Sequence, residues 1–176
     1  MIKLLPILFL LGPNVPDNDP DQKPPRIRVL LDENITRGTL KSGAQIHIIL
    51  PQTKQTFRIL PAQPSVEVRC RGLRIQLAGE SLPKGEILLV PRTSGELRWK
   101  GRNYHGSLLL RPTGSQTFHA INIVDLENYV LGVLPTEMGA RAPLNALKAQ
   151  AICARSYAHA QMIDRRTSSF DAYADV

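Results

Sequence analysis

The chain has 176 residues, of which 43% are hydrophobic and 21% are charged, and these proportions indicate a globular protein with one core rather than a disordered tail. Its formal net charge of +7 arises in the middle of the sequence, because residues 34–124 hold 13 Lys and Arg against four Asp and Glu. A basic surface of this kind attracts anionic polymers, but the absence of an aromatic RNA-binding signature argues against nucleic acid as the partner.

The N-terminus predicts export. Residues 1–12, MIKLLPILFLLG, combine one Lys with an apolar run that Pro6 interrupts. This run resembles the hydrophobic region of a secretory signal and is too short to span a bilayer. No small-residue cleavage site follows Gly12, which leaves an uncleaved signal open. Residues 13–25 are rich in Pro and Asp, with almost nothing apolar to bury, and predict an extended linker.

The chain from Arg26 to about Val124 is expected to form antiparallel sheets. Short apolar runs alternate with Gly and Pro, and several show strict period-two alternation. The intervals between these runs are too short for crossover helices, which excludes a doubly wound parallel sheet. We therefore expect a sandwich or partial barrel built from nine strands, namely RIRVLL, QIHIIL, TFRIL, VEVRC, LRIQL, EILLV, ELRWK, SLLLR and TFHAINIV.

Helical patterns begin at Asp125. Asp125 can cap a short helix over residues 126–130, with Gly132 as its terminator and a loop, VLPTEMGARA, after it. A second helix is predicted from about Pro143 to Arg165. Its buried face is expected to hold Leu144, Leu147, Ala151, Ala154, Ala158 and Met162. The fold class is therefore α+β, with one domain over residues 26–176.

The cysteines and histidines indicate no metal site. Cys70 and Cys153 permit one disulfide or two free thiols, and the alanine-rich helix around Cys153 predicts a small buried thiol there. The four histidines are not at ligand spacing with another ligand, so no metal ligand is predicted.

Glu137 is the candidate for acid–base chemistry. It follows Pro135 in the expected loop, and a short rigid connection between helices is a suitable mount for a catalytic group. In a cleft partly lined by Val133 and Met138, desolvation would raise the pKa of its carboxyl group and let it act as a general acid. The alternative is a solvated surface glutamate.

A long stretch of the sequence resembles one family. The run INIVDLENYVLGVLPTEM, followed by PLNALKAQAICARSYAHAQ, closely resembles the signature of the SpoIID/LytB family of stage II sporulation protein D and amidase enhancers. The shared features are a Tyr-containing turn, a Pro-Thr-Glu-Met loop, and a helix with Ala-Leu-Lys-Ala-Gln-Ala and Ala-Arg-Ser-Tyr-Ala. The resemblance covers residues 100–176 firmly and 26–99 loosely.

The resemblance implies an extracytoplasmic lytic transglycosylase that cleaves peptidoglycan glycan strands and leaves 1,6-anhydro-N-acetylmuramyl ends. The essential glutamate of the family's loop is then Glu137. Gln150, Lys148 and Arg155 are candidates for substrate binding, although Arg155 serves equally as an ion-pair partner that holds the loop. Tyr129 and Tyr157 lie in the matching segments, and we expect both to pack in the core or the cleft wall.

The family pattern continues beyond Val176, through a segment that in some members holds zinc. The resemblance therefore implies no cofactor for the residues given and predicts weakened catalysis. A second hypothesis is a non-catalytic wall-binding module that presents a surface to a cell-wall amidase. A two-carboxylate hydrolase that uses Asp125, Glu127 or Asp175 stays open, although their spacing does not favour it.

Overall fold

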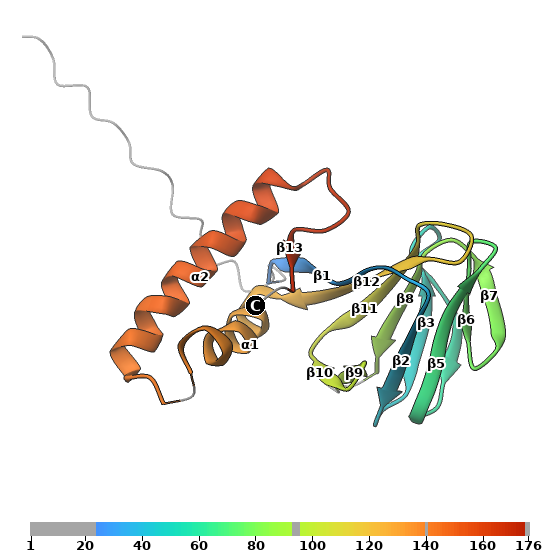
Figure 1. The fold of residues 1–176 in the computed structure, drawn as a ribbon, viewed down its shortest axis with the longest axis horizontal. Coiled ribbons are helices and arrows are strands. Elements are labelled where there is room, and N and C mark those ends of the chain that lie inside the picture. The colour runs from blue at the N-terminus through green and yellow to red at the C-terminus, as the bar shows by residue number, and fades with distance from the viewer. Residues whose placement is uncertain (1–23, 93–95, 140, 175–176) are drawn as a thin grey trace, which may run out of the picture.

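The computed structural model describes residues 24–92, 96–139 and 141–174. The predicted signal segment, and all but the last two residues of the predicted linker, lie outside the described residues. The described chain is rich in strands up to residue 125, and two helices follow (Figure 1), which confirms the α+β class. Within the described residues, no helix has the length and apolar character needed to cross a membrane.

The strands form two sheets, with seven and six members. The seven-stranded sheet has the order β13 (Ala172–Tyr173), β1 (Arg26–Ile35), β12 (Phe118–Asp125), β11 (Ser107–Pro112), β8 (Ile87–Pro91), β3 (Ile46–Leu50) and β4 (Gln55–Leu60). The six-stranded sheet has the order β10 (Arg102–Tyr104), β9 (Leu97–Trp99), β2 (Arg37–Ser42), β5 (Gln63–Arg71), β6 (Arg74–Leu77) and β7 (Glu80–Lys84). Neighbours are antiparallel, except that β13 pairs with β1 in parallel.

The two sheets enclose the main hydrophobic core as a sandwich, one of the two predicted arrangements. Inward side chains of both sheets form one buried cluster, in which the Trp99 and Phe118 rings meet edge to face with centroids 6.3 Å apart. Gly38 lies under the Trp99 ring, where a Cβ atom would come within 2.2 Å of it. The nine predicted strands are all present, and the four that were not predicted, β2, β7, β10 and β13, have at most six residues each.

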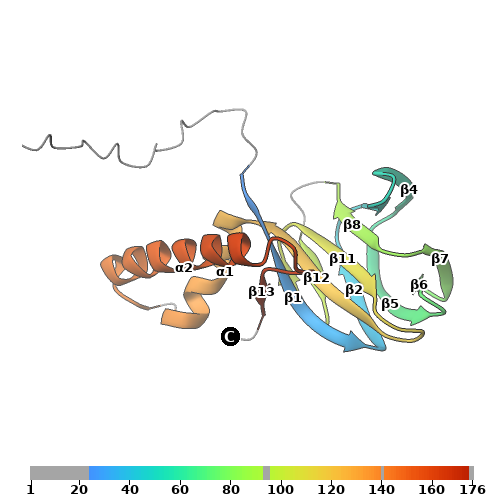
Figure 2. The same ribbon diagram turned by 90° about the horizontal axis from the view of Figure 1, so that it is seen from above.

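The helices pack together at one end of the sandwich. In Figures 1 and 2, β1 and β12 run out of the sandwich as a pair toward α1 (Leu126–Met138) and α2 (Leu144–Asp164). A second buried cluster joins these elements, with Ile27 and Val29 of β1 packed among α1 and α2 side chains. As predicted, Asp125 caps α1, because its carboxylate accepts a hydrogen bond of 2.9 Å from the backbone N–H of Asn128.

The structure corrects the predicted end of the first helix. α1 continues through Gly132 and Pro135 and ends at Met138. The C-cap residue Gly139 has a positive φ of 76° and donates its N–H to the Pro135 carbonyl. An interior Gly costs about 1 kcal/mol in helix propensity, and packing against α2 offsets this cost. Residues 133–138, predicted as loop, are therefore helical, and Glu137 lies in the last turn of α1.

The buried face of α2 is confirmed in its centre and wrong at its start. Ala158 is 1% exposed, and Ala151, Ala154 and Met162 pack around it. Leu144, in contrast, is 66% exposed, because it lies at the helix start beyond the part that α1 covers. The prediction of a buried Cys153 is also wrong. Cys153 follows Ala151 by two residues and so points to the opposite, exposed side, while the other free thiol, Cys70, is buried.

Candidate functional site

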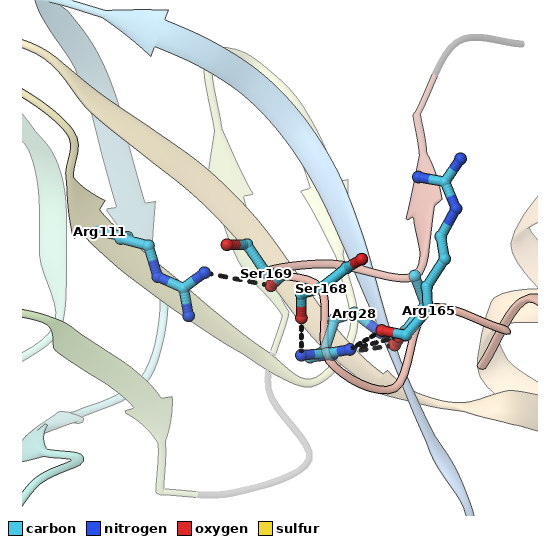
Figure 3. Close-up of polar contacts among 6 residues, drawn as sticks. Arg28, Arg111, Arg165, Ser168 and Ser169 are labelled. Atoms are coloured by element: carbon cyan, nitrogen blue, oxygen red, sulfur yellow. Dashed lines mark hydrogen bonds and ion pairs between the residues drawn. The ribbon is translucent and has the colours of Figure 1, made fainter. Parts of the chain in front are cut away.

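The segment after α2 folds back onto β1 (Figure 3), and an ion pair between Arg28 and Asp171 fixes it there. The Asp171 side chain is 4% exposed and accepts hydrogen bonds from the backbone N–H of Arg28 at 2.8 Å and from its guanidinium group at 2.5 Å. Arg28 also donates to the carbonyl oxygens of Ser168 and Arg165. The hydrogen bond to Asp171 raises the pKa of Arg28 above its ordinary value, so the guanidinium group stays charged. We call the pair of Arg28 and Asp171 the clamp.

The docked segment forms one wall of a cavity that contains Glu137. The cavity has a volume of about 200 Å³ and lies between α1, α2 and the segment after α2. It combines two carboxylates, three phenols and a guanidinium group, and its lining residues are Tyr129, Val133, Glu137, Ala154, Tyr157, Gln161, Arg165, Asp171, Ala172 and Tyr173. The cavity is therefore polar and aromatic, which suits a sugar ring better than an apolar ligand.

Glu137 is held at this cavity by a residue of the neighbouring helix. The amide Nε2 of Gln150 lies 2.6 Å from Oε2 of Glu137 and donates a hydrogen bond to it. Glu137 is exposed and Gln150 is half-buried, so the burial expected for the glutamate is not seen. The hydrogen bond occupies one carboxylate oxygen and fixes the direction in which the other can meet a ligand.

Tyr129 lines the same cavity as Glu137. Burial raises the pKa of Tyr129, and the nearby Glu137 and Tyr157 raise it further. The phenol therefore stays protonated and available as a hydrogen-bond donor toward the cavity. Tyr129 and Tyr157 both line the cavity, in agreement with the prediction that they form the cleft wall.

Arg165 brings the positive charge of the cavity. Its guanidinium carbon lies 5.5 Å from the ring centroid of Tyr173 and 5.9 Å from that of Phe170. Stacking on two rings restrains the arginine, and the two rings also contact each other with centroids 4.9 Å apart. A cation in a restrained position on the wall of the same cavity can bind a carboxylate group of a ligand.

A second cavity, of about 290 Å³, adjoins the first. The two cavities share the lining residues Tyr129, Val133 and Tyr173. The second one extends toward β1, β10 and β12, where it meets side chains with hydrogen-bonding groups, including Asn103, His105, Asn128 and Thr136. Together the cavities offer space for more than one unit of an extended polymer.

The structure brings together two of the four predicted site residues. Glu137 and Gln150 meet at the cavity, as described. Arg155 instead makes a bidentate ion pair with Glu127 of α1, with both N–O distances at 2.7 Å, which is the alternative role foreseen for it. Lys148 is exposed and does not line the cavity. Of the carboxylates considered for a hydrolase, Glu127 is held by this pair, Asp125 caps α1, and Asp175 lies outside the described residues.

The sequence analysis missed two cavity residues at the end of α2, Gln161 and Arg165. They continue a stripe on one side of α2 whose members are spaced four, three, four and four positions apart. The stripe consists of Gln150, Ala154, Tyr157, Gln161 and the C-cap residue Arg165. Gln150 contacts Glu137, and the other four line the cavity. This spacing is that of one helix face and could have been found by tracing polar residues from Gln150. The wall from residues 171–173 had no comparable signal.

Comparison with known proteins finds a family match that covers the helices. Residues 114–176 match the SpoIID family, described as stage II sporulation protein. An uncharacterized protein of Brachyspira hyodysenteriae is 43% identical over 70 residues, which are 40% of this chain and 19% of that protein, so the matched part spans about a fifth of the relative's length. No solved structure matches the chain. The matched residues, 114–176, contain both helices and every side chain that lines the cavity of Glu137, so this part of the chain is similar to the SpoIID family.

Proposed function

We propose that the chain cleaves glycan strands of peptidoglycan as a lytic transglycosylase, with Glu137 as both acid and base. The observation that supports this proposal most directly is that the two carboxylates lining the cavity differ in their exposure and in their hydrogen-bond partners. Asp171 is buried and fully engaged by Arg28, whereas Glu137 is exposed and has one hydrogen-bond donor, Gln150. A single carboxylate free to exchange protons fits a reaction that needs one acid–base group, and not a hydrolase with two.

The reaction has two steps at Glu137. The protonated carboxyl group donates its proton to the glycosidic oxygen, the bond between this oxygen and C1 of the N-acetylmuramyl residue breaks, and the leaving sugar keeps the electron pair. The carboxylate then accepts the proton of the 6-hydroxyl group of the same residue while its O6 forms a bond to C1. The products are a 1,6-anhydro end and a glycan with a free 4-hydroxyl group, and Glu137 is again protonated.

The neighbours of Glu137 have separate tasks in this proposal. Gln150 holds one carboxylate oxygen, which directs the other toward the scissile bond. Tyr129, which stays protonated, can donate a hydrogen bond to a sugar hydroxyl group. Arg165 can pair with the lactyl carboxylate that a glycan exposes once its stem peptides are removed. A bound sugar would displace water from the exposed carboxyl group and so supply the desolvation that the free chain lacks.

The proposal is tested with glycan strands from which the stem peptides have been removed. Wild type should form 1,6-anhydro ends, detected by mass spectrometry, and Glu137→Gln should lose at least about a hundredfold in rate, the lower range for loss of an acid–base group. Glu33→Gln, an exposed glutamate on β1 away from the cavity, is the matched control and should retain activity.

Two outcomes would contradict the proposal. Free reducing ends in place of anhydro ends would identify a hydrolase, because water would then have attacked C1. Binding of glycan without any cleavage would leave the second candidate, a wall-binding module that acts beside an amidase. The apolar N-terminal run supports action outside the cytoplasm for both candidates.

A further inference from the structure

The outer face of the six-stranded sheet is strongly basic. Residues of a strand point alternately to its two faces, so those that flank the buried positions point outward. Among the strand residues of the described part of this sheet, Glu67 is the outward carboxylate, and Glu96, which directly precedes β9, lines a hollow with Lys41 and Arg98. The outward cations, which we call the basic face, are Arg37, Lys41, Arg69, Arg71, Arg74, Lys84 and Arg98.

The strand register places these cations directly opposite one another. Like charges in opposed positions of a sheet repel and destabilise it. Such pairs occur at every strand boundary from β9 to β7, as Lys41 with Arg98, Arg37 with Arg69, Arg71 with Arg74, and Arg74 with Lys84. Glu67 relieves part of this repulsion through its ion pair of 2.9 Å with Arg69. The remaining repulsion is a cost to the fold that a bound anion would remove.

Three strand arginines outside the basic face each have a carboxylate partner. Arg28 pairs with Asp171, Arg58 pairs with Glu80, and Arg111 pairs with Glu86. On the basic face, in contrast, Glu67 pairs with Arg69, and among the described residues no carboxylate pairs with Arg37, Arg71, Arg74 or Arg98. This contrast separates the basic face from an ordinary solvated sheet surface, where both signs of charge are mixed.

A hollow lies at one end of the basic face. It has a volume of about 530 Å³ and is lined by the cations Arg37, Arg69 and Arg71, together with hydrogen-bonding side chains of Thr36, Gln76 and Gln116. Guanidinium groups from β2 and β5 approach it from two neighbouring strands. A tetrahedral phosphate presents oxygens in several directions and can accept from both strands at once, whereas a planar carboxylate suits a single guanidinium fork.

We propose that the basic face binds a linear phosphate polymer without bases, such as a polyol phosphate of the cell envelope, with one phosphate in the hollow. Neighbouring strands lie about 4.8 Å apart, so the five strands from β9 to β7 present cations over about 19 Å, enough for several phosphates of an extended chain. The outward positions described in these five strands hold no aromatic side chain, so this face lacks the stacking platform that single-stranded nucleic acid uses. The face is separate from the cavity of Glu137, so this inference goes beyond glycan cleavage.

The test measures binding of the 176-residue chain to fluorescent poly(glycerol phosphate) by anisotropy over a range of salt concentrations. The double variant Arg37→Gln with Arg71→Gln should bind roughly tenfold more weakly at moderate salt. Its plot of log affinity against log salt should be shallower by about 1.4, at about 0.7 for each lost phosphate contact. Its melting temperature should not fall, because the substitutions remove repulsion between cations.

The matched control is Arg26→Gln with Arg166→Gln, two exposed cations outside the basic face. It changes the net charge equally and should leave affinity within about twofold. Glu137→Gln should bind like wild type, so a failure of the glycan proposal leaves this one intact. The proposal is overturned if both double variants weaken binding equally, if polygalacturonate binds as tightly as the phosphate polymer, or if oligothymidylate with the same number of phosphates binds more tightly.

Discussion

Nε2 of Gln150 lies 2.6 Å from Oε2 of Glu137, although the two residues belong to different helices. The position of the glutamate therefore depends on how α1 and α2 pack, and not on α1 alone. This relationship makes Gln150 a positioning residue for the proposed reaction. A change at Gln150 therefore tests the orientation of the carboxyl group without removing that group.

Gln150→Ala should lower kcat for anhydro-end formation about tenfold and leave KM within about twofold, because the carboxyl group remains but is no longer oriented. Steady-state kinetics on denuded glycan measures both constants. His159→Ala, on the exposed side of α2, is the control and should change neither. A raised KM with unchanged kcat would instead make Gln150 a substrate-binding residue.

Arg155→Gln should lower the free energy of unfolding by less than about 1 kcal/mol, because its ion pair with Glu127 is largely exposed. The hydrogen bond from Arg155 lowers the pKa of Glu127. The contribution of the pair is therefore complete above the ordinary glutamate pKa and is lost as pH falls through the lowered value. Urea unfolding of wild type and variant at neutral and acidic pH should show the difference shrink in acid.

The same variant tests the expectation that Arg155 binds substrate. In the structure its guanidinium group is occupied by Glu127, so KM for glycan should stay within about twofold of wild type. If KM rises tenfold while stability is unchanged, Arg155 leaves Glu127 to contact the glycan, and the substrate-binding role predicted from the resemblance holds.

Asp171→Ala should destabilise the protein by about 3 kcal/mol, because it leaves the Arg28 guanidinium and backbone N–H without their buried acceptor. Glu80→Gln breaks an exposed pair with Arg58 and serves as the control, with an expected loss below about 1 kcal/mol. Urea denaturation measures both. Equal losses from the two variants would show that the clamp on β1 is no stronger than a surface pair.

Gly38→Ala should destabilise the sandwich by about 3 kcal/mol through overpacking. The new Cβ would meet the Trp99 ring at 2.2 Å, and the ring cannot shift easily because its Nε1 donates a 2.6 Å hydrogen bond to Asp32. Gly43→Ala, which meets nothing within 4 Å, should stay within about 0.5 kcal/mol of wild type. A Gly38→Ala variant as stable as wild type would mean that the sheets separate without strain.

The sequence was sufficient for the parts of the fold that local patterns specify. Alternating apolar residues identified nine strands, and Asp125 marked the start of α1. The end of α1 could not be predicted, because Gly132 and Pro135 are ordinary helix breakers whose cost is offset only by contacts with α2. The strands β2, β7 and β10 were missed because each is short and gains its stability from neighbouring strands.

The candidate site also has one part that the sequence predicted and another part that it did not. Glu137 and Gln150 came from a family pattern in contiguous sequence, and the structure places them in contact. The remaining wall depends on Asp171 and Arg28, which are 143 residues apart. No local pattern specifies a pairing at that distance, since both partners read as ordinary surface charges until the fold brings them together.

The parallel pairing of β13 with β1 has a consequence for the order in which the protein matures. β1 is the first described strand, yet its outer edge is covered by residues 172–173, near the other end of the described chain. During synthesis that edge must stay open until residues 172–173 have emerged, and closing so long a loop is slow. Tyr173 of β13 is also a wall of the cavity that holds Glu137, so the sandwich can form before the cavity is complete. Activity should therefore appear after the bulk of the fold, as a late step that refolding experiments can time.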